Sequence, residues 1–574
     1  MHAKNHKTTK QTDSALSPAT NPSWRFGELP AAELMPHLQR YLLAQDAKAN
    51  WQLVWLNNNG RPVIGLLPKM SWSVYFNIAN NQLPNEQSAT YKVIRQCRDV
   101  ETTNDADNSN AITTAYMSYE EWQNSLTTYS KDYETETDDV ISTTDITKNP
   151  NYHHGLIGFI GYDIAAHELS PAANIELAAQ PCAVLGHYDI YLSPKENSRT
   201  GWQLTVNTTA NSPGKTVDDE CSDKAVIALI SYLDRLDKKF SDTCLSQKHL
   251  ESSKPAPLIL QARWGKHDYQ QAFDRTQDYL KQGDCYQINL TQEWRGQLAH
   301  KTSNTQSTSS LIDYLPMLYR NTQAPFAGYL SVSGMNDSTN TPNRLANPFE
   351  LLSCSPELFF TFKKDANTGK HHIITKPIKG TMPRGATNEQ DNGYKNQLSD
   401  SEKDRAENVM IVDLLRNDLG KYAKIGSVKV PQLFAIESFS NVHHMVSTIT
   451  AELKENTHPL AVLFGSLPAG SITGTPKKRA VEIISELETA PRGAYCGTMG
   501  YMNFDGSGQW NVLIRTLQAN ASSHNDLNRE KHISLWAGGG ITVASDCDAE
   551  YQECLDKVGN LLSVLAQKNL SKQH

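Results

Sequence analysis

The chain has 574 residues, of which 39% are hydrophobic and 20% are charged, and its formal net charge is -8 at pH 7. This length exceeds what one small core needs, and the composition is typical of a soluble globular protein with several domains or one large composite one. The negative charge argues against a nucleic-acid partner, and the lack of an apolar stretch of about 20 residues argues against a membrane span.

Residues 1–23 are polar and rich in Lys, Thr, Asn and Ser. They lack the apolar centre of a secretory signal, so we expect a disordered tail. The nine cysteines are scattered and none forms a CxxC pair. A disulfide framework or a zinc site is therefore not expected, and we expect a cytoplasmic protein.

Residues 24–260 are expected to form an N-terminal region with two polar inserts, at about 101–150 and 195–257. The inserts offer little apolar surface to offset the entropy lost on ordering, so their composition predicts loops. One exception is Ala225 to Leu236, whose apolar residues have helical spacing.

Residues 261–568 have a more regular pattern. Strand candidates adjoin in sequence without a regular βαβ alternation, which favours an α+β fold with antiparallel sheets. The apolar periodicity predicts helices at His267–Gln282, Asp400–Leu419, Thr475–Glu488 and Cys547–Gln567, and strands at Cys285–Trp294, Pro325–Val332, Tyr495–Met502 and Val512–Gln518.

Lys379 lies in the segment TKPIKGTMPRG, whose two prolines fix the backbone and whose two glycines permit unusual dihedral angles. Lys376 and Arg384 are close in sequence, and their positive charge favours the uncharged form of the Lys379 amine, which is the nucleophilic form. A solvated lysine in a surface turn is the alternative, and the segment taken alone favours it.

Two of the expected helices carry carboxylates that could form ion pairs or bind a metal ion. Glu550, Glu553 and Lys557 are spaced to share one face of the last helix, a pattern that most often means exposed ion pairs. Glu407 precedes an apolar run on the other helix. Mg²⁺ takes one or two protein carboxylates and completes its shell with water and an anionic substrate, so the functional alternative is a magnesium site at Glu407 and Glu553.

Two glycine-rich segments indicate close approach of the backbone to a ligand. The segment GSLPAGSITGTPK enters a helix, where backbone N–H groups favour a carboxylate or phosphate; an ordinary helix-entry loop is the alternative. Gly538, Gly539 and Gly540 follow a strand-like run and indicate either a tight hairpin or a ligand. Arg515 can bind a carboxylate through its guanidinium, whereas a lone histidine such as His444 is more often structural.

Eight motifs follow one another along the chain: CYQINLTQ, SPE, PIKGT, DRAENVMIVDLLRNDLGK, GSLPAGSITGTPK, RGAYCGTMGY, GGGIT and AEYQECLDK. Taken in order, they resemble the motifs of the chorismate-utilising enzymes, the family that includes the large subunits of anthranilate synthase and aminodeoxychorismate synthase. Their order leaves little room for coincidence. The resemblance implies a composite fold of antiparallel sheets flanked by helices, with residues 261–568 as the chorismate-binding catalytic domain.

The resemblance also implies roles for single residues. Chorismate, which has two carboxylates, would be held by Mg²⁺ between Glu407 and Glu553, with Glu550 nearby. Glu357 of the SPE motif would be the general acid, and His444 matches a histidine near the ring carboxylate. The other positions implied around the substrate are Gly380, Thr381, Ser471, Tyr495, Arg515, Gly538, Gly539, Gly540 and Lys557.

Lys379 occupies the position that distinguishes members of this family. Anthranilate synthases have alanine there, whereas the lysine resembles aminodeoxychorismate synthase component I, in which the amine is proposed to attack C2 while the C4 hydroxyl leaves. Ammonia then adds at C4 and expels the lysine. We therefore expect an aminodeoxychorismate synthase of 4-aminobenzoate and folate biosynthesis. No glutaminase nucleophile motif is found in the chain, so the resemblance implies a separate glutamine amidotransferase partner.

Three alternatives stay open at this point. The first is anthranilate synthase component I, and the second is an isochorismate-type enzyme that adds water. The third is an inactive protein that binds chorismate or a partner. The presence of Lys379, Glu357, Glu407 and Glu553 argues against the third.

Overall fold

The structure is a computed structural model of the chain. Among the residues that it describes, no helix combines the length and the hydropathy that a bilayer-spanning segment needs. The described residues are 22–44, 52–77, 90–98, 112–137, 149–171, 173–176, 178, 180–195, 200–207, 224–241, 255–298, 310–336, 344–346, 348–439, 442–521 and 531–567.

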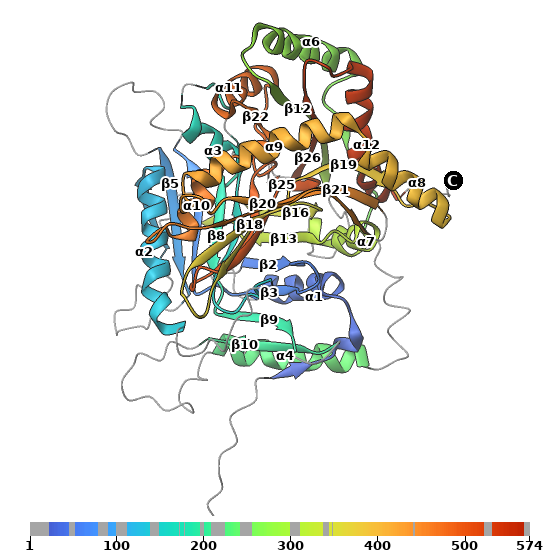
Figure 1. The fold of residues 1–574 in the computed structure, drawn as a ribbon. Helices are drawn as coiled ribbons and strands as arrows, with labels where there is room; N and C mark the ends of the chain where they lie inside the picture. Colours follow the sequence, from blue (N-terminus) through green and yellow to red (C-terminus); the bar gives the residue numbers. More distant parts are fainter. Residues whose placement is uncertain are drawn as a thin grey trace, which may run out of the picture.

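Two large antiparallel sheets form the centre of the molecule (Figure 1), and in the described residues each has 12 strands. Both sheets draw strands from the two halves of the chain, so the N-terminal region and residues 261–568 share their sheets. The first sheet contains, in spatial order, β1 (Ser23–Trp24), β10 (Trp202–Val206), β9 (Ile190–Pro194), β3 (Val63–Leu66), β2 (Gln52–Leu56), β13 (Phe326–Val332), β16 (Phe349–Ser355), β25 (Thr516–Ala521), β26 (Lys531–Ile541), β12 (Gln287–Leu298) and β11 (Gln261–Ala262), with β22 (Gly474–Thr475) paired to β12.

The second sheet carries the segment around Lys379 at one edge. It contains, in spatial order, β19 (Ile378–Pro383), β21 (Val442–Glu452), β18 (His371–Thr375), β17 (Leu358–Lys364), β24 (Gly508–Asn511), β23 (Thr498–Asn503), β7 (Gly155–Ile160), β8 (Ala183–His187), β4 (Met70–Phe76), β5 (Tyr91–Cys97) and β6 (Ile112–Met117), with β20 (Lys429–Ser438) paired to β21. A separate pair is formed by β14 (Met335–Asn336) and β15 (Arg344–Ala346).

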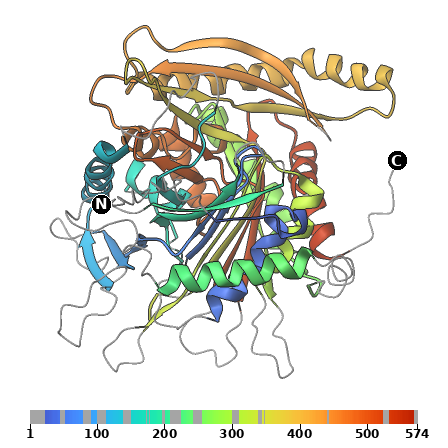
Figure 2. The ribbon, with the colours of Figure 1, turned by 90° about the horizontal axis from the view of Figure 1, so that it is seen from below.

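Helices flank the sheets, as expected for this α+β fold. Figure 2 shows that the yellow-to-orange part of the chain, which holds α8, α9 and β19 to β21, forms an outer layer along one side. The helices are α1 (Ala31–Leu43), α2 (Tyr119–Thr137), α3 (Tyr162–Leu169), α4 (Lys224–Ser241), α6 (Lys266–Gln282), α7 (Leu315–Thr322), α8 (Asn388–Ser399), α9 (Glu402–Gly420), α10 (Pro459–Ser466), α11 (Lys477–Leu487) and α12 (Cys547–Leu565), with short 3₁₀ turns η1 (Phe26–Glu28), η4 (Leu311–Tyr314) and η5 (Gly470–Ile472).

The two sheets pack face to face through one buried apolar cluster. Val54 and Leu330 from the first sheet meet Phe159 and Met499 from the second, and all four side chains are fully or almost fully buried. Alternate residues of each strand point into this layer, as in other stacked sheets. This contact fixes the position of one sheet relative to the other, and with it the positions of side chains carried by both sheets.

Most of the elements expected in residues 261–568 are confirmed with small shifts of their ends. Helix α6 ends where Gly283 adopts a left-handed φ of 85°, as its glycine predicts. The helix expected from Thr475 begins later, with Pro476 at its N-cap. The strand expected over Val512–Gln518 begins only at β25, because Arg515 has a φ of 52° and interrupts the extended chain.

The prediction of loops in the first polar insert is wrong for residues 112–137, which form β6 and α2. Tyr119, Trp122 and Leu126 are spaced by one helical period and are buried in the core beneath the second sheet. Most residues of the insert are polar, so its overall composition did not indicate this buried stripe. In the second insert the expected helix is confirmed as part of α4, and β10 is an additional strand; the disordered tail expected at residues 1–23 and the rest of both inserts lie mainly outside the described residues.

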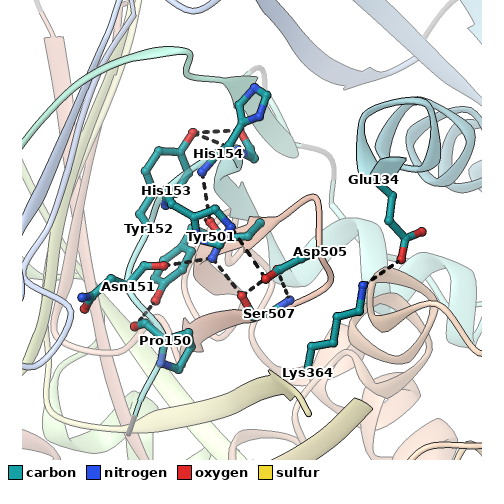
Figure 3. Close-up of polar contacts among 12 residues, drawn as sticks. Glu134, Pro150, Asn151, Tyr152, His153, His154, Lys364, Tyr501, Asp505 and Ser507 are labelled. Atoms are coloured by element: carbon teal, nitrogen blue, oxygen red, sulfur yellow. Dashed lines mark hydrogen bonds and ion pairs between the residues drawn. The ribbon is translucent and has the colours of Figure 1, made fainter. Parts of the chain in front are cut away.

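Helix α2 and the segment that leads into β7 are also held by polar contacts (Figure 3). Lys364 of β17 forms an ion pair of 3.5 Å with Glu134 of α2. Tyr501 of β23 donates a hydrogen bond of 2.6 Å to the Pro150 carbonyl, and His153 lies 3.6 Å from the Asp505 carboxylate. These contacts join the end of the first insert to the central sheet.

Replacing Leu126 by alanine tests the packing of α2. The side chain is fully buried, so its loss should lower the free energy of unfolding by about 2–5 kcal/mol. Urea denaturation measures the change. Asn124→Ala, at an exposed position of the same helix, is the control and should change stability by no more than about 0.5 kcal/mol. Equal effects of the two changes would contradict the burial of α2.

Candidate active site

A cavity of about 530 Å³ opens where β19, α9, the loop around η5, β26 and α12 meet. Except for Gly539, every residue that the sequence analysis proposed for catalysis, substrate binding or metal binding lines it. The lining residues among those proposals are Glu357, Lys379, Gly380, Thr381, Glu407, His444, Ser471, Tyr495, Arg515, Gly538, Gly540, Glu550, Glu553 and Lys557.

Lys379 is directed into this cavity by a β-bulge. The register of β19 against β21 shifts between Lys379 and Thr381, and Gly380, between them, has a φ of 71°. A Cβ at Gly380 would lie 2.6 Å from Leu398 and 2.8 Å from Asp404, so only glycine fits this bulge. The bulge explains why the lysine is followed by glycine.

The Lys379 ammonium lies 3.3 Å from the Glu407 carboxylate, and both side chains are largely shielded from solvent. Lys376 and Arg384, whose charges we expected to act on Lys379, are paired elsewhere. Lys376 forms an ion pair with Glu437 at 2.8 Å, and Arg384 forms one with Asp391 at 2.7 Å. The surroundings of Lys379 are therefore set by the cavity's own charges and not by its neighbours in sequence.

Glu357 is a buried carboxyl group beside Lys379. Burial raises its pKa to about 7, although Lys379 nearby and a hydrogen bond from the Ile378 backbone N–H oppose the shift. Ser471 also contacts this carboxyl group through its side chain. A carboxyl group of this kind still holds its proton near neutral pH and can act as a general acid.

His444 lies on the same wall, opposite Thr381 in the strand register. Its Nδ1 is 2.9 Å from the Thr381 hydroxyl. Burial, with the charge of Arg515 as a second cause, lowers its pKa to about 4. The imidazole is therefore neutral at pH 7, so it can donate or accept one hydrogen bond at each ring nitrogen but brings no charge.

Three carboxylates, Glu407, Glu550 and Glu553, face the cavity from α9 and α12. Hard oxygen ligands of this kind suit Mg²⁺, which needs only one or two of them when an anionic substrate completes its shell. Within the described residues no group of three or more His, Cys, Asp or Glu side chains is arranged to hold a metal ion by itself. The donor set thus fits an open Mg²⁺ site better than a structural metal site.

Amines of the chain lie next to these carboxylates. Besides Lys379, Lys403 lies 3.2 Å from Glu550 and 4.0 Å from Glu407, and Lys557 lies 2.8 Å from Glu553. The charged residues of α12 thus form ion pairs, as their spacing alone suggested. These ion pairs lie at the cavity.

The three glycines of β26 bring the backbone close to these groups. A Cβ at Gly538 would lie 2.0 Å from the Leu290 carbonyl, and one at Gly540 would lie 2.4 Å from the Gln287 side chain. A Cβ at Gly539 would lie 2.9 Å from the Glu550 carboxylate. Larger residues would therefore displace either β12 or the proposed metal ligand.

Tyr495 and Trp536 form an aromatic wall, with ring centroids 6.1 Å apart and nearly parallel planes. Trp536, Lys403 and Asn289 also line the cavity, although the sequence did not indicate them as site residues. Lys403 precedes Glu407 by one helical turn, so the i, i+4 spacing was a usable signal. Asn289 lies within the CYQINLTQ motif, but no spacing rule singles it out.

Comparison with known proteins gives consistent results. The family model of chorismate binding enzyme matches residues 86–563. Aminodeoxychorismate synthase component 1 of Klebsiella aerogenes is 40% identical over 422 residues, covering 72% of this chain and 77% of that protein. The Salmonella typhimurium protein of the same name is 36% identical over 417 residues, with coverage of 72% and 77%. Anthranilate synthase component 1 of Acetivibrio thermocellus is 28% identical over 420 residues, covering 73% and 76%.

The fold is also that of a solved relative. Anthranilate synthase component I from Streptococcus pneumoniae superposes with a TM-score of 0.55 at 19% sequence identity, covering 96% of this chain and 100% of that one. This likeness confirms the expected architecture. With the family match over most of its length and the family's motifs gathered around one cavity, the chain belongs to the chorismate binding enzymes.

Proposed function

We propose that the chain is the chorismate-converting subunit of an aminodeoxychorismate synthase, which forms 4-amino-4-deoxychorismate from chorismate and ammonia. The observation that carries the proposal is the placement of Lys379 inside the cavity, beside both Glu407 and Glu357. The relatives named aminodeoxychorismate synthase component 1 support it.

The proposed reaction has two substitutions. The Lys379 nitrogen bonds to ring carbon C2 while the C4–O bond breaks, and the departing hydroxyl takes the proton of Glu357 and leaves as water. Ammonia then bonds to C4, and the C2–N bond to Lys379 breaks. Hydroxide is a poor leaving group, so a buried acid that is still protonated near pH 7 is what the first step needs.

Glu407 and Glu553 are the proposed protein ligands of Mg²⁺, with Glu550 nearby. When bound, the ion would neutralise and orient a substrate carboxylate. Arg515 and Lys557 add positive charge on the same walls, which suits a substrate with two carboxylates. Ser471, Tyr495 and the Gly538–Gly540 backbone would fix its orientation.

The source of ammonia is proposed to be a separate glutamine amidotransferase, in the pathway to 4-aminobenzoate and folate. The support is that the named relatives are called component 1. The proposed setting is the cytoplasm.

Replacing Lys379 by alanine should abolish 4-amino-4-deoxychorismate formation, because the covalent route needs the amine. Mass spectrometry of the product formed from chorismate, Mg²⁺ and ammonium measures this; it also distinguishes anthranilate, isochorismate and no reaction. In the wild type, rapid quenching should reveal a Lys379 peptide heavier by chorismate minus water. Lys376→Ala is the matched control, since Lys376 pairs with Glu437. Unchanged product from Lys379→Ala would sink the covalent role.

The rate of chorismate conversion should fall as the pH rises through about 7, because Glu357 loses its proton there. The sign follows from burial, which raises this carboxyl pKa. Glu357→Gln should lower kcat by about 10²–10⁴-fold and remove this limb of the pH–rate profile. A limb that persists in Glu357→Gln would assign the titration to another group.

Glu407→Gln and Glu553→Gln should each weaken Mg²⁺ binding by at least about tenfold, because each removes a charged oxygen ligand. Titration calorimetry with Mg²⁺ in the presence of chorismate measures the affinity without requiring turnover. Glu402→Gln is the control, since Glu402 is exposed at the start of the same helix. Unaltered Mg²⁺ affinity in both variants would remove these residues as ligands.

A further inference from the structure

The loop that carries Ser471 runs from the end of α10 to the start of α11, with η5 at its centre. Ser471 lines the cavity. Two cationic side chains, Lys477 and Arg492, contact the main chain of this loop from outside the cavity, and the reaction proposed above does not use either of them.

Lys477 holds the first part of the loop. Its ammonium donates hydrogen bonds to the carbonyl oxygens of Ser466, at 3.1 Å, and Pro468, at 3.2 Å. It also lies 2.7 Å from the carboxylate of Asp418, which is 3% exposed. The lysine therefore joins the loop to α9.

The connection to α9 matters because that helix carries Glu407. Asp418 follows Glu407 by about three helical turns, so the two carboxylates lie on nearly the same side of α9. Leu414, between them, packs on the loop so tightly that a Cβ at Gly470 would lie 2.1 Å from its Cδ2. The loop and the proposed metal-binding helix thus form one packed unit.

Arg492 holds the other end. Its guanidinium donates to the carbonyl oxygens of Ile472, at 3.1 Å, and Asn289, at 2.8 Å. Two further bonds, of 2.7 and 2.6 Å, join it to the Glu488 carboxylate, which also accepts from the Thr291 backbone N–H at 2.9 Å. Arg492 is 2% exposed. These contacts tie the loop's second end to β12.

Ser471 is the residue between the two anchored parts. Its side chain contacts the Glu357 carboxyl group, and this contact opposes the rise in the Glu357 pKa that burial causes. Buried ion pairs are costly unless each charge is well partnered. Here both cations complete their contacts with carbonyl oxygens of one short loop.

We infer that Lys477 and Arg492 are positioning residues, which fix the main chain on both sides of Ser471 and hold its hydroxyl against Glu357 and the bound substrate. The inference rests on the proposed function for the identity of that substrate, chorismate.

Lys477→Met is the first test, with Lys478→Met as its matched control. Lys478 is the next residue of the same helix and is exposed. Lys477→Met should weaken chorismate binding, measured by calorimetry with Mg²⁺, by about tenfold, the order of one lost hydrogen bond to a charged group. Lys478→Met should leave it unchanged. Because Lys477→Met removes the nearer of the two cations that pair with the buried Asp418 and leaves it only Lys421, at 3.4 Å, Asp418→Asn/Lys477→Met is tested in parallel and should show the same loss.

A double-mutant cycle separates positioning from general destabilisation. In a Ser471→Ala background, Lys477→Met should weaken chorismate binding no further, because the hydroxyl that it positions is gone. Arg492→Gln, made together with Glu488→Gln to avoid a lone buried charge, should behave in the same way. Additive losses, or a Lys477→Met protein that matches Lys478→Met, would overturn the inference.

The pH–rate profile supplies a second readout. Because the Ser471 contact lowers the pKa of Glu357, both Ser471→Ala and Lys477→Met should move the alkaline limb to higher pH. The cations that face Glu357, namely Lys379, Lys557 and Arg515, are unchanged in these variants. An unmoved limb in Lys477→Met would contradict the inference.

Failure of the proposed function gives a different result. A wild-type protein that binds chorismate but forms another product leaves the binding cycle intact and refutes only the aminodeoxychorismate assignment. A wild-type protein that does not bind chorismate refutes both.

Discussion

The cavity brings lysines and carboxylates together, and its inner members, Lys379, Glu407 and Glu550, can be shielded from water because each has a partner of opposite charge. Lys379 lies beside Glu407, Lys403 beside Glu550 and Lys557 beside Glu553. An unpaired charge in such a site would cost several kcal/mol, whereas paired charges tolerate the low dielectric. The partners come from β19, α9 and α12, so the composite fold is needed to assemble them.

The same burial acts in opposite directions on the two groups that can exchange protons. It raises the pKa of Glu357 to about 7 and lowers that of His444 to about 4. At neutral pH a large fraction of the Glu357 carboxyl groups is therefore protonated, whereas the His444 imidazole is neutral and is not a cationic acid. When the environment moves the pKa values of two neighbouring groups apart in this way, it determines which of them can act as the acid. Glu357 is therefore the better proton donor, and His444 is better suited to hydrogen bonding near Thr381.

The sequence predicted the regular helices of residues 261–568 well: α6 and α12 have clear apolar stripes, α6 has a glycine stop, and α9 was found although two polar residues, Asn408 and Asp418, share its buried face. Two predictions failed for local reasons. The buried stripe of Trp122 and Leu126 lies in an insert whose composition is mainly polar. Arg515 has a left-handed backbone conformation, which shortens a strand that looks continuous in the sequence. Glu407 and Glu553 are far apart in sequence, so no spacing rule predicts that they meet at one cavity; their residue type made them candidate Mg²⁺ ligands, and the family resemblance implied that they act together. The bulge at Gly380 also depends on tertiary neighbours, Leu398 and Asp404, which no local pattern reveals.

The supports of the Ser471 loop show why stability alone does not explain this part of the molecule. Apolar residues of similar size in place of Lys477 with Asp418, or of Arg492 with Glu488, would often leave a protein equally stable or more so. Apolar side chains, however, cannot direct backbone carbonyl groups, and four such groups on the loop and β12 are held by these two cations. The geometry of the loop, rather than the strength of the core, is what these ion pairs determine. A buried cation that binds main-chain oxygens is therefore a mark of a loop whose exact placement matters to the cavity beside it.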